Sequence, residues 1–136
     1  MHAANYALMP ESALSVMLKQ CSRSAPHASG SWTPTREQLD QLERHLPQLA
    51  GLAERQGMSP RDVDPKASFR QYLGVIVDNR HFIYVNAIAA SDLKPPYSPD
   101  PHIKPVIVCD GGSAFWGVLY DPDTKTFSQL DANGAI

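Results

Sequence analysis

The spacing of hydrophobic residues changes along this chain, from a helical period in the first half to an extended period in the second. Residues 10–23 form the first predicted helix, with Pro10 suited to its first turn. The apolar side chains of this helix recur at steps of three and four, at Leu14, Met17, Leu18 and Cys21. Cys21 is therefore expected to face the core at the helix end.

A second apolar stripe, made of leucines, follows a polar loop over residues 22–31. Its start is marked either by Thr33 with Pro34 or by Thr35 with Gln38 as a capping box. The leucines recur at helical steps, at Leu39, Leu42, Leu46 and Leu49. Pro47 lacks a backbone donor, so we expect it to kink or end this helix, with a further piece up to Gly57. A leucine stripe of this kind is typical of core packing, with binding to a partner helix as the alternative.

From residue 69 onward the chain is rich in β-branched and aromatic residues, which favours strands. The predicted strands are residues 69–77, 81–89, 106–109, 114–120 and 125–130. The first two form a hairpin around residues 78–80, because Asp and Asn tolerate the positive φ of a tight turn. Four prolines in residues 91–104 exclude a ladder there. Residues 106–109 are wholly apolar, which predicts a central strand covered on both faces.

Helices followed by strands in hairpin order predict an α+β fold. We expect two or three N-terminal helices packed on one face of an antiparallel sheet of about five strands. The 136 residues suit a single domain, 1–136, with a helical part at about 10–57 and a sheet part at about 68–131.

The composition excludes several classes of function. A net charge of −2 with scattered basic residues argues against nucleic-acid binding. No run approaches the ~20 apolar residues of a membrane span. Residues 1–20 lack a basic segment before their apolar part, so no leader is visible, and a lipid anchor would require that a leader had been removed.

The two cysteines, Cys21 and Cys109, allow one disulfide. Both fall on predicted inward faces, and a bridge between them would contribute ~4–5 kcal/mol in the chain-entropy model. Such a bridge indicates an oxidising compartment such as a periplasm. The alternative is two separate buried thiols.

Candidate chemistry is sparse. Cys109 with His81 or His102 could act as a thiol nucleophile, although nothing in the spacing requires it. Carboxylates in turns could bind calcium or simply stabilise the turns, and they are Asp110, Asp121, Asp123 and Asp131. The five histidines have no ligand spacing and there is no Cys-x-x-Cys pair, so zinc is not expected. We predict no catalytic set, no metal and no cofactor.

Two loops are candidate contact surfaces for a protein partner. The first is centred on a Gly-Gly pair beside two aromatic residues, and its candidate residues are Gly111, Gly112, Ser113, Phe115 and Trp116. Phe115 and Trp116 point to opposite faces of a strand, so one is expected in the core and the other exposed as an anchor. The second loop is stiffened by proline and carries Tyr97, His102 and Ile103. Both loops could equally be structural.

Several short motifs resemble a group of small, largely uncharacterised bacterial exported proteins and lipoproteins. The motifs are Tyr84-Val85-Asn86-Ala87, residues 106–121 with Val-Cys-Asp-Gly-Gly, Phe-Trp-Gly and Tyr-Asp-Pro, Phe127, and Asn133-Gly134. The resemblance covers roughly the C-terminal half and implies export, but it carries no activity. Some small periplasmic proteins of comparable plan act as immunity proteins or lysozyme inhibitors, which is an analogy of fold.

These observations favour a non-enzymatic periplasmic protein-binding module. One form of it is an inhibitor or immunity protein for a cell-wall hydrolase or toxin. The alternative is a small thiol-dependent hydrolase that uses Cys109 with a histidine.

Overall fold

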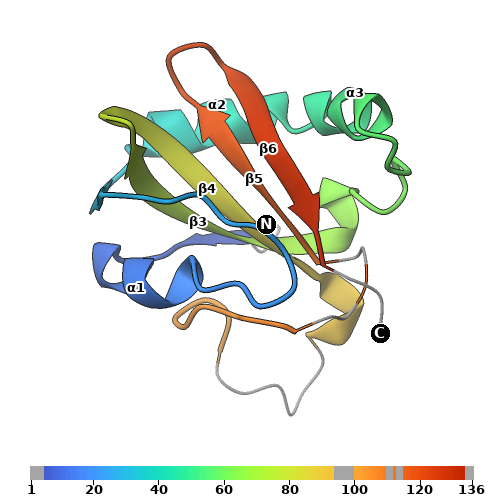
Figure 1. The fold of residues 1–136 in the computed structure, drawn as a ribbon, viewed down its shortest axis with the longest axis horizontal. Helices are drawn as coiled ribbons and strands as arrows, with labels where there is room; N and C mark the ends of the chain where they lie inside the picture. Colours follow the sequence, from blue (N-terminus) through green and yellow to red (C-terminus); the bar gives the residue numbers. More distant parts are fainter. Residues whose placement is uncertain (1–4, 94–99, 110–111, 113–114, 134–136) are drawn as a thin grey trace.

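The computed structural model describes residues 5–93, 100–109, 112 and 115–133 (Figure 1). Within them, six strands form one sheet in the order β1-β3-β4-β5-β6, and β2 also pairs with β3. The strands are β1 Tyr6–Leu8, β2 Gly30–Trp32, β3 Ser68–Val77, β4 Arg80–Ala89, β5 Trp116–Asp121 and β6 Thr126–Ala132. Only the β1–β3 pairing is parallel among these described strands, and the predicted α+β class is confirmed.

The predicted β3–β4 hairpin is confirmed. Its two turn residues, Asp78 and Asn79, have φ values of 50° and 63°, the left-handed conformation that Asn and Asp tolerate best. The register runs without interruption from Ser68 opposite Ala89 to Val77 opposite Arg80. This hairpin forms the centre of the sheet.

The leucine stripe folds as α2, Arg36–His45, and α3, Gln48–Arg55. Of the two possible starts, the capping box is observed: Thr35 Oγ1 accepts from the backbone N–H of Gln38, and Gln38 Oε1 accepts from that of Thr35. The helices separate at Pro47, as predicted. No helix in the described part of the chain is long and apolar enough to cross a bilayer.

The first predicted helix is much shorter than expected. It consists of a 3-10 turn, Glu11–Ala13, and one turn of α-helix, α1 Leu14–Met17. Gln20 Nε2 donates to the carbonyl of Met17, the acceptor that the Cys21 N–H would use in a continuing helix. Cys21 therefore lies beyond the helix and is exposed, so the prediction that it faces the core is wrong.

Helices cover both faces of the sheet rather than one. The leucines of α2 and α3 pack on the face that carries Tyr72, Val85 and Trp116. Met17 of α1 packs on the opposite face, with Leu73 and Leu119. Figure 1 shows the layers, with α2 and α3 on one side of the sheet and α1 on the other. Most buried side chains on both faces of β3, β4 and β5 are therefore apolar.

Residues 106–109 are not a strand, which corrects the prediction of a central strand there. Val106 is buried, but Cys109 is exposed. The sheet instead gains two three-residue strands, β1 and β2, which both pair with β3. The predicted turn between β5 and β6 is confirmed, because the Asp121 carboxylate accepts from the N–H groups of Asp123 and Thr124.

Candidate functional site

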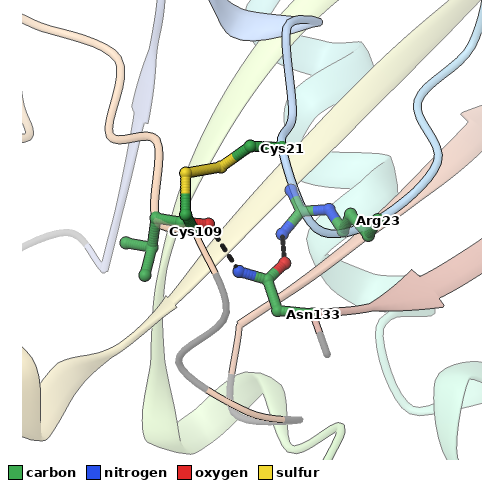
Figure 2. Close-up of a disulfide and its surroundings, with 5 residues drawn as sticks. Cys21, Arg23, Cys109 and Asn133 are labelled. Atoms are coloured by element: carbon green, nitrogen blue, oxygen red, sulfur yellow. Dashed lines mark hydrogen bonds between the residues drawn. A yellow bond between two sulfur atoms is a disulfide. The ribbon is translucent and has the colours of Figure 1, made fainter. Parts of the chain in front are cut away.

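The predicted disulfide between Cys21 and Cys109 is confirmed, with Cα atoms 5.3 Å apart (Figure 2). Both half-cystines are exposed, so the bond lies at the surface and not between inward faces. It joins two irregular segments, the loop after α1 and the segment before β5. With its sulfur bonded to Cys21, Cys109 has no thiolate to act as a nucleophile in this state.

A row of directly paired residues crosses the sheet beneath these two segments. We call it the polar row, and it consists of Gln71, Asn86, Gly117 and Asp131. The rows on either side of it are apolar. One neighbouring row contains Leu73, Tyr84 and Leu119, and the other contains Phe69, Ile88 and Phe115. The polar row thus divides one face of the sheet into two apolar clusters.

Gln71 is fully buried, and its amide fixes the segment that precedes Cys109. Its Nε2 donates to the carbonyls of Pro101 and Lys104, each at 2.7 Å. Its Oε1 accepts from the N–H of Val106 and from the side chain of Asn86, each at 3.0 Å. An amide side chain offers two donors and two lone pairs, so Gln71 is fully satisfied. Its bond to the N–H of Val106 takes the place of the strand pairing that residues 106–109 do not form.

Arg23 joins the loop after α1 to the same row. Its guanidinium donates to Asn86 Oδ1 at 2.6 Å, and to Tyr84 Oη and Asn133 Oδ1 at 2.9 Å. Gly117 leaves room for it, because a Cβ there would lie 3.0 Å from Arg23 Nε. Burial raises the pKa of Tyr84, and Arg23 opposes that shift.

The C-terminal end of β6 completes the arrangement around the disulfide. Asn133 accepts from Arg23 and donates to the carbonyl of Val108, one residue before Cys109 (Figure 2). Asp131 accepts from the backbone N–H of Ser24 at 2.6 Å. Both segments that the disulfide joins are therefore also held to the sheet by hydrogen bonds.

Gln71 also holds a tight turn, residues 100–104, at the surface. The carbonyl of Asp100 accepts from the N–H groups of Ile103 and Lys104, at 3.0 and 2.9 Å. The backbone N–H and then the ring of His102 hold the pKa of the Asp100 carboxyl below its ordinary value. Ile103 is 63% exposed, the most exposed large apolar side chain in the described part of the chain. The turn presents an isoleucine on a fixed backbone.

Contact with a partner stays a prediction, and the structure places four of the seven predicted contact residues. His102 is exposed on this turn. The centroids of its ring and of the Phe69 ring lie 4.8 Å apart in a T-shaped arrangement. Gly112 has φ of +84°, a conformation that favours glycine. Gly111, Ser113 and Tyr97 lie outside the described residues.

The prediction that either Phe115 or Trp116 is exposed as an aromatic anchor is wrong. Trp116 is 1% exposed and Phe115 is 7% exposed. The two side chains do point to opposite faces, but both faces are covered: Trp116 lies in the cluster under α2 and α3, and Phe115 in the cluster with Phe69 and Ile88. If helices covered only one face of the sheet, either Phe115 or Trp116 would have been exposed to solvent.

Of the carboxylates considered for calcium, those of Asp121 and Asp131 serve local structure. Asp121 forms an ion pair with Arg80 and accepts from turn N–H groups. Asp110 lies outside the described residues. Among the described side chains, no group of three or more His, Cys, Asp or Glu is placed to hold a metal ion.

The polar row was not predicted from the sequence. Gln71 and Asn86 each interrupt an apolar stretch of a predicted strand, and that interruption was the available indication. The ion pair of Arg70 with Glu43, at 3.0 Å, was not predicted either. Arg70 likewise stands in an apolar strand, with its side chain 5% exposed.

No protein-family model matches this chain, and neither a curated protein nor a solved structure is significantly similar to it.

Proposed function

We propose that this protein is a non-enzymatic binding module of an oxidising compartment such as the periplasm, and that turn 100–104 contacts a protein partner. The observation that carries the proposal is the clamp of Gln71 on Pro101 and Lys104, which holds the exposed Ile103 on a fixed backbone. The surface disulfide supports an oxidising compartment, because cytosolic thiols are kept reduced.

The energetics favour a contact at this turn. Burying Ile103 against a partner would contribute about 1–2 kcal/mol, since full burial of such a side chain is worth about 1.5–3 kcal/mol and it is already partly covered. Ordering a mobile segment on binding commonly cancels gains of this size. Here the backbone is already held by Gln71 and by the bonds to Asp100, so little entropy is lost on docking.

The narrower form of the proposal is an inhibitor or immunity protein for a cell-wall hydrolase. A protruding turn with an apolar tip suits the concave cleft of an enzyme. The support for this form is the exported resemblance and the fixed turn, and the partner is then the hydrolase itself.

The test is inhibition of purified peptidoglycan hydrolases, namely a lysozyme, an amidase and an endopeptidase, on isolated cell walls. We expect one class to be inhibited, and Ile103→Asp to weaken inhibition at least about tenfold, because a charge replaces the buried contact. Ala50→Asp adds the same charge on α3, behind the sheet, and should leave inhibition unchanged.

Inhibition that survives Ile103→Asp would exclude the turn as the contact. If none of the three classes is inhibited, the hydrolase form of the proposal fails. If, in addition, the disulfide is absent from protein isolated with thiols blocked from its native cells, the oxidising compartment fails as well.

A further inference from the structure

A cavity of about 460 Å³ lies behind the sheet, on the side of α2 and α3. Its size is within the range of small-molecule sites, ~300–1,000 Å³. It is separate from turn 100–104 and plays no part in the function proposed above. Its walls are mainly apolar and include Leu46, Pro47, Ala50 and Val63.

The polar part of the cavity is the ion pair of Glu43 and Arg70. All three nitrogens of the Arg70 guanidinium donate to acceptors within the protein. Its Nε donates to Tyr72 Oη, its Nη1 to the carbonyls of Pro65 and Ser68, and its Nη2 to Glu43. With its nitrogens engaged in this way and its side chain 5% exposed, Arg70 is poorly placed to bind an anionic ligand.

Glu43 retains hydrogen-bonding capacity toward the cavity. Its Oε2 is occupied by Tyr72 and by Arg70. Its Oε1 accepts one bond, from Arg70 Nη2 at 3.0 Å, among the residues that the structure describes. The Glu43 side chain is 27% exposed, whereas that of Arg70 is 5% exposed. The cavity thus offers a carboxylate acceptor at its polar end, and the side-chain donors of its lining apart from Arg70 are those of Asn5 and Lys66.

The charges that line the cavity cancel. Glu43 is paired with Arg70, and the other two ionisable lining residues are Asp64 and Lys66. A ligand with a full charge would have to leave water for a site with no net opposite charge, which is costly. An uncharged donor loses less solvation and can still bond to a carboxylate, which is among the stronger hydrogen bonds in proteins.

From this geometry we infer that the cavity is a binding site for a small uncharged molecule with an apolar body and one hydroxyl or amide N–H donor. The apolar body lies against Leu46, Ala50 and Val63, and the donor bonds to Glu43 Oε1.

The test uses benzyl alcohol and benzyl methyl ether as probes, which share the apolar ring and differ in the donor. Each is titrated into ¹⁵N-labelled protein while amide resonances are followed. We expect benzyl alcohol to shift the resonances of Ala50 and Val63 and to bind about tenfold more tightly than the ether, the ratio that corresponds to ~1.4 kcal/mol for the hydrogen bond. Benzoate and benzylamine serve as charged probes and should bind more weakly than the alcohol.

The larger side chain of Ala50→Phe should fill the cavity and abolish the change that benzyl alcohol causes in the Val63 amide resonance. Ala50→Leu adds a smaller side chain and should reduce that change. Arg55→Phe is the matched control, because Arg55 is exposed on α3 and outside the cavity lining. The inference is overturned if the ether binds as tightly as the alcohol, if a charged probe binds best, or if no probe shifts the cavity resonances at tens of millimolar. Binding that persists in Ala50→Phe would also place the site elsewhere.

Discussion

Removal of the disulfide tests whether the bond stabilises the protein by restricting the unfolded chain or by maintaining the native structure. Cys21 and Cys109 are separated by 88 positions. In the chain-entropy model, a crosslink over a loop of this length stabilises the fold by about 4–5 kcal/mol at 25 °C. Unfolding of a chain of this size changes the entropy by about 0.3 kcal/mol/K, so the melting temperature should fall by about 15 °C.

The native structure should survive that loss. Arg23 remains bonded to Asn86, and the backbone N–H of Val106 to Gln71, so both segments stay on the polar row without the crosslink. The destabilisation therefore arises almost entirely in the denatured state, which gains conformational freedom. Amide resonance changes should be confined to the surroundings of the two cysteines.

The assay compares urea denaturation of the oxidised protein with that of the Cys21→Ser/Cys109→Ser variant, alongside their ¹H–¹⁵N spectra. A phosphine reductant should reproduce the loss in the native protein, since both half-cystines are exposed, and should leave the double variant unchanged. A loss below about 2 kcal/mol would show that the reduced denatured chain is already compact. Collapse of the native spectrum would show that the hydrogen bonds of the polar row do not suffice to hold the two segments.

Variants at three further sites test other contacts, each by chemical denaturation. Glu43→Ala leaves Arg70 buried without its carboxylate and should cost about 3–5 kcal/mol, whereas Arg36→Ala, in an exposed pair, should cost under about 1 kcal/mol. Gly117→Ala should cost about 2 kcal/mol or more, because its Cβ would lie 2.4 Å from Tyr84 Oη. Burial raises the pKa of Tyr120 from 10.0 to about 12, so its neutral phenol stabilises the fold fully below pH 10 and loses this contribution as the pH rises to 12. Tyr120→Phe should reduce the fall in stability between those pH values, and an unchanged slope would contradict that assignment.

The elements predicted correctly are those whose determinants lie within a few residues. The capping box of Thr35 and Gln38, the break at Pro47 and the Asp78-Asn79 turn each depend on local backbone geometry. The disulfide pairing was also predicted, because two cysteines allow one intramolecular bond. The reasoning about inward faces was wrong, since Cys21 lies beyond the helix end and is exposed.

The wrong predictions share a cause. An apolar stretch shows that a segment is buried, but it does not specify which other part of the chain packs against it. Residues 106–109 are apolar enough for a strand, but Val106 bonds to the side chain of Gln71 and not to a neighbouring strand. Phe115 and Trp116 alternate as expected, yet both are buried because α2–α3 and the disulfide-linked segments cover opposite faces. The three-residue strands β1 and β2 have too few residues for a recognisable pattern, and they form because the edge of β3 accepts them.

The amino-acid sequence by itself determined the capping box of Thr35, the break at Pro47 and the β3–β4 hairpin, because neighbouring residues supply those hydrogen bonds and turns. The order of helical and extended patterns determined the α+β class, and the presence of two cysteines determined the single possible disulfide. The tertiary structure decided the path of residues 100–109, the polar row and the cavity beside Glu43. In each of these, a buried polar group finds its partner far along the chain, as Gln71 does at Lys104 and Glu43 at Arg70. A backbone carbonyl or guanidinium taken out of water must be bonded, and only the folded arrangement determines which distant group does so.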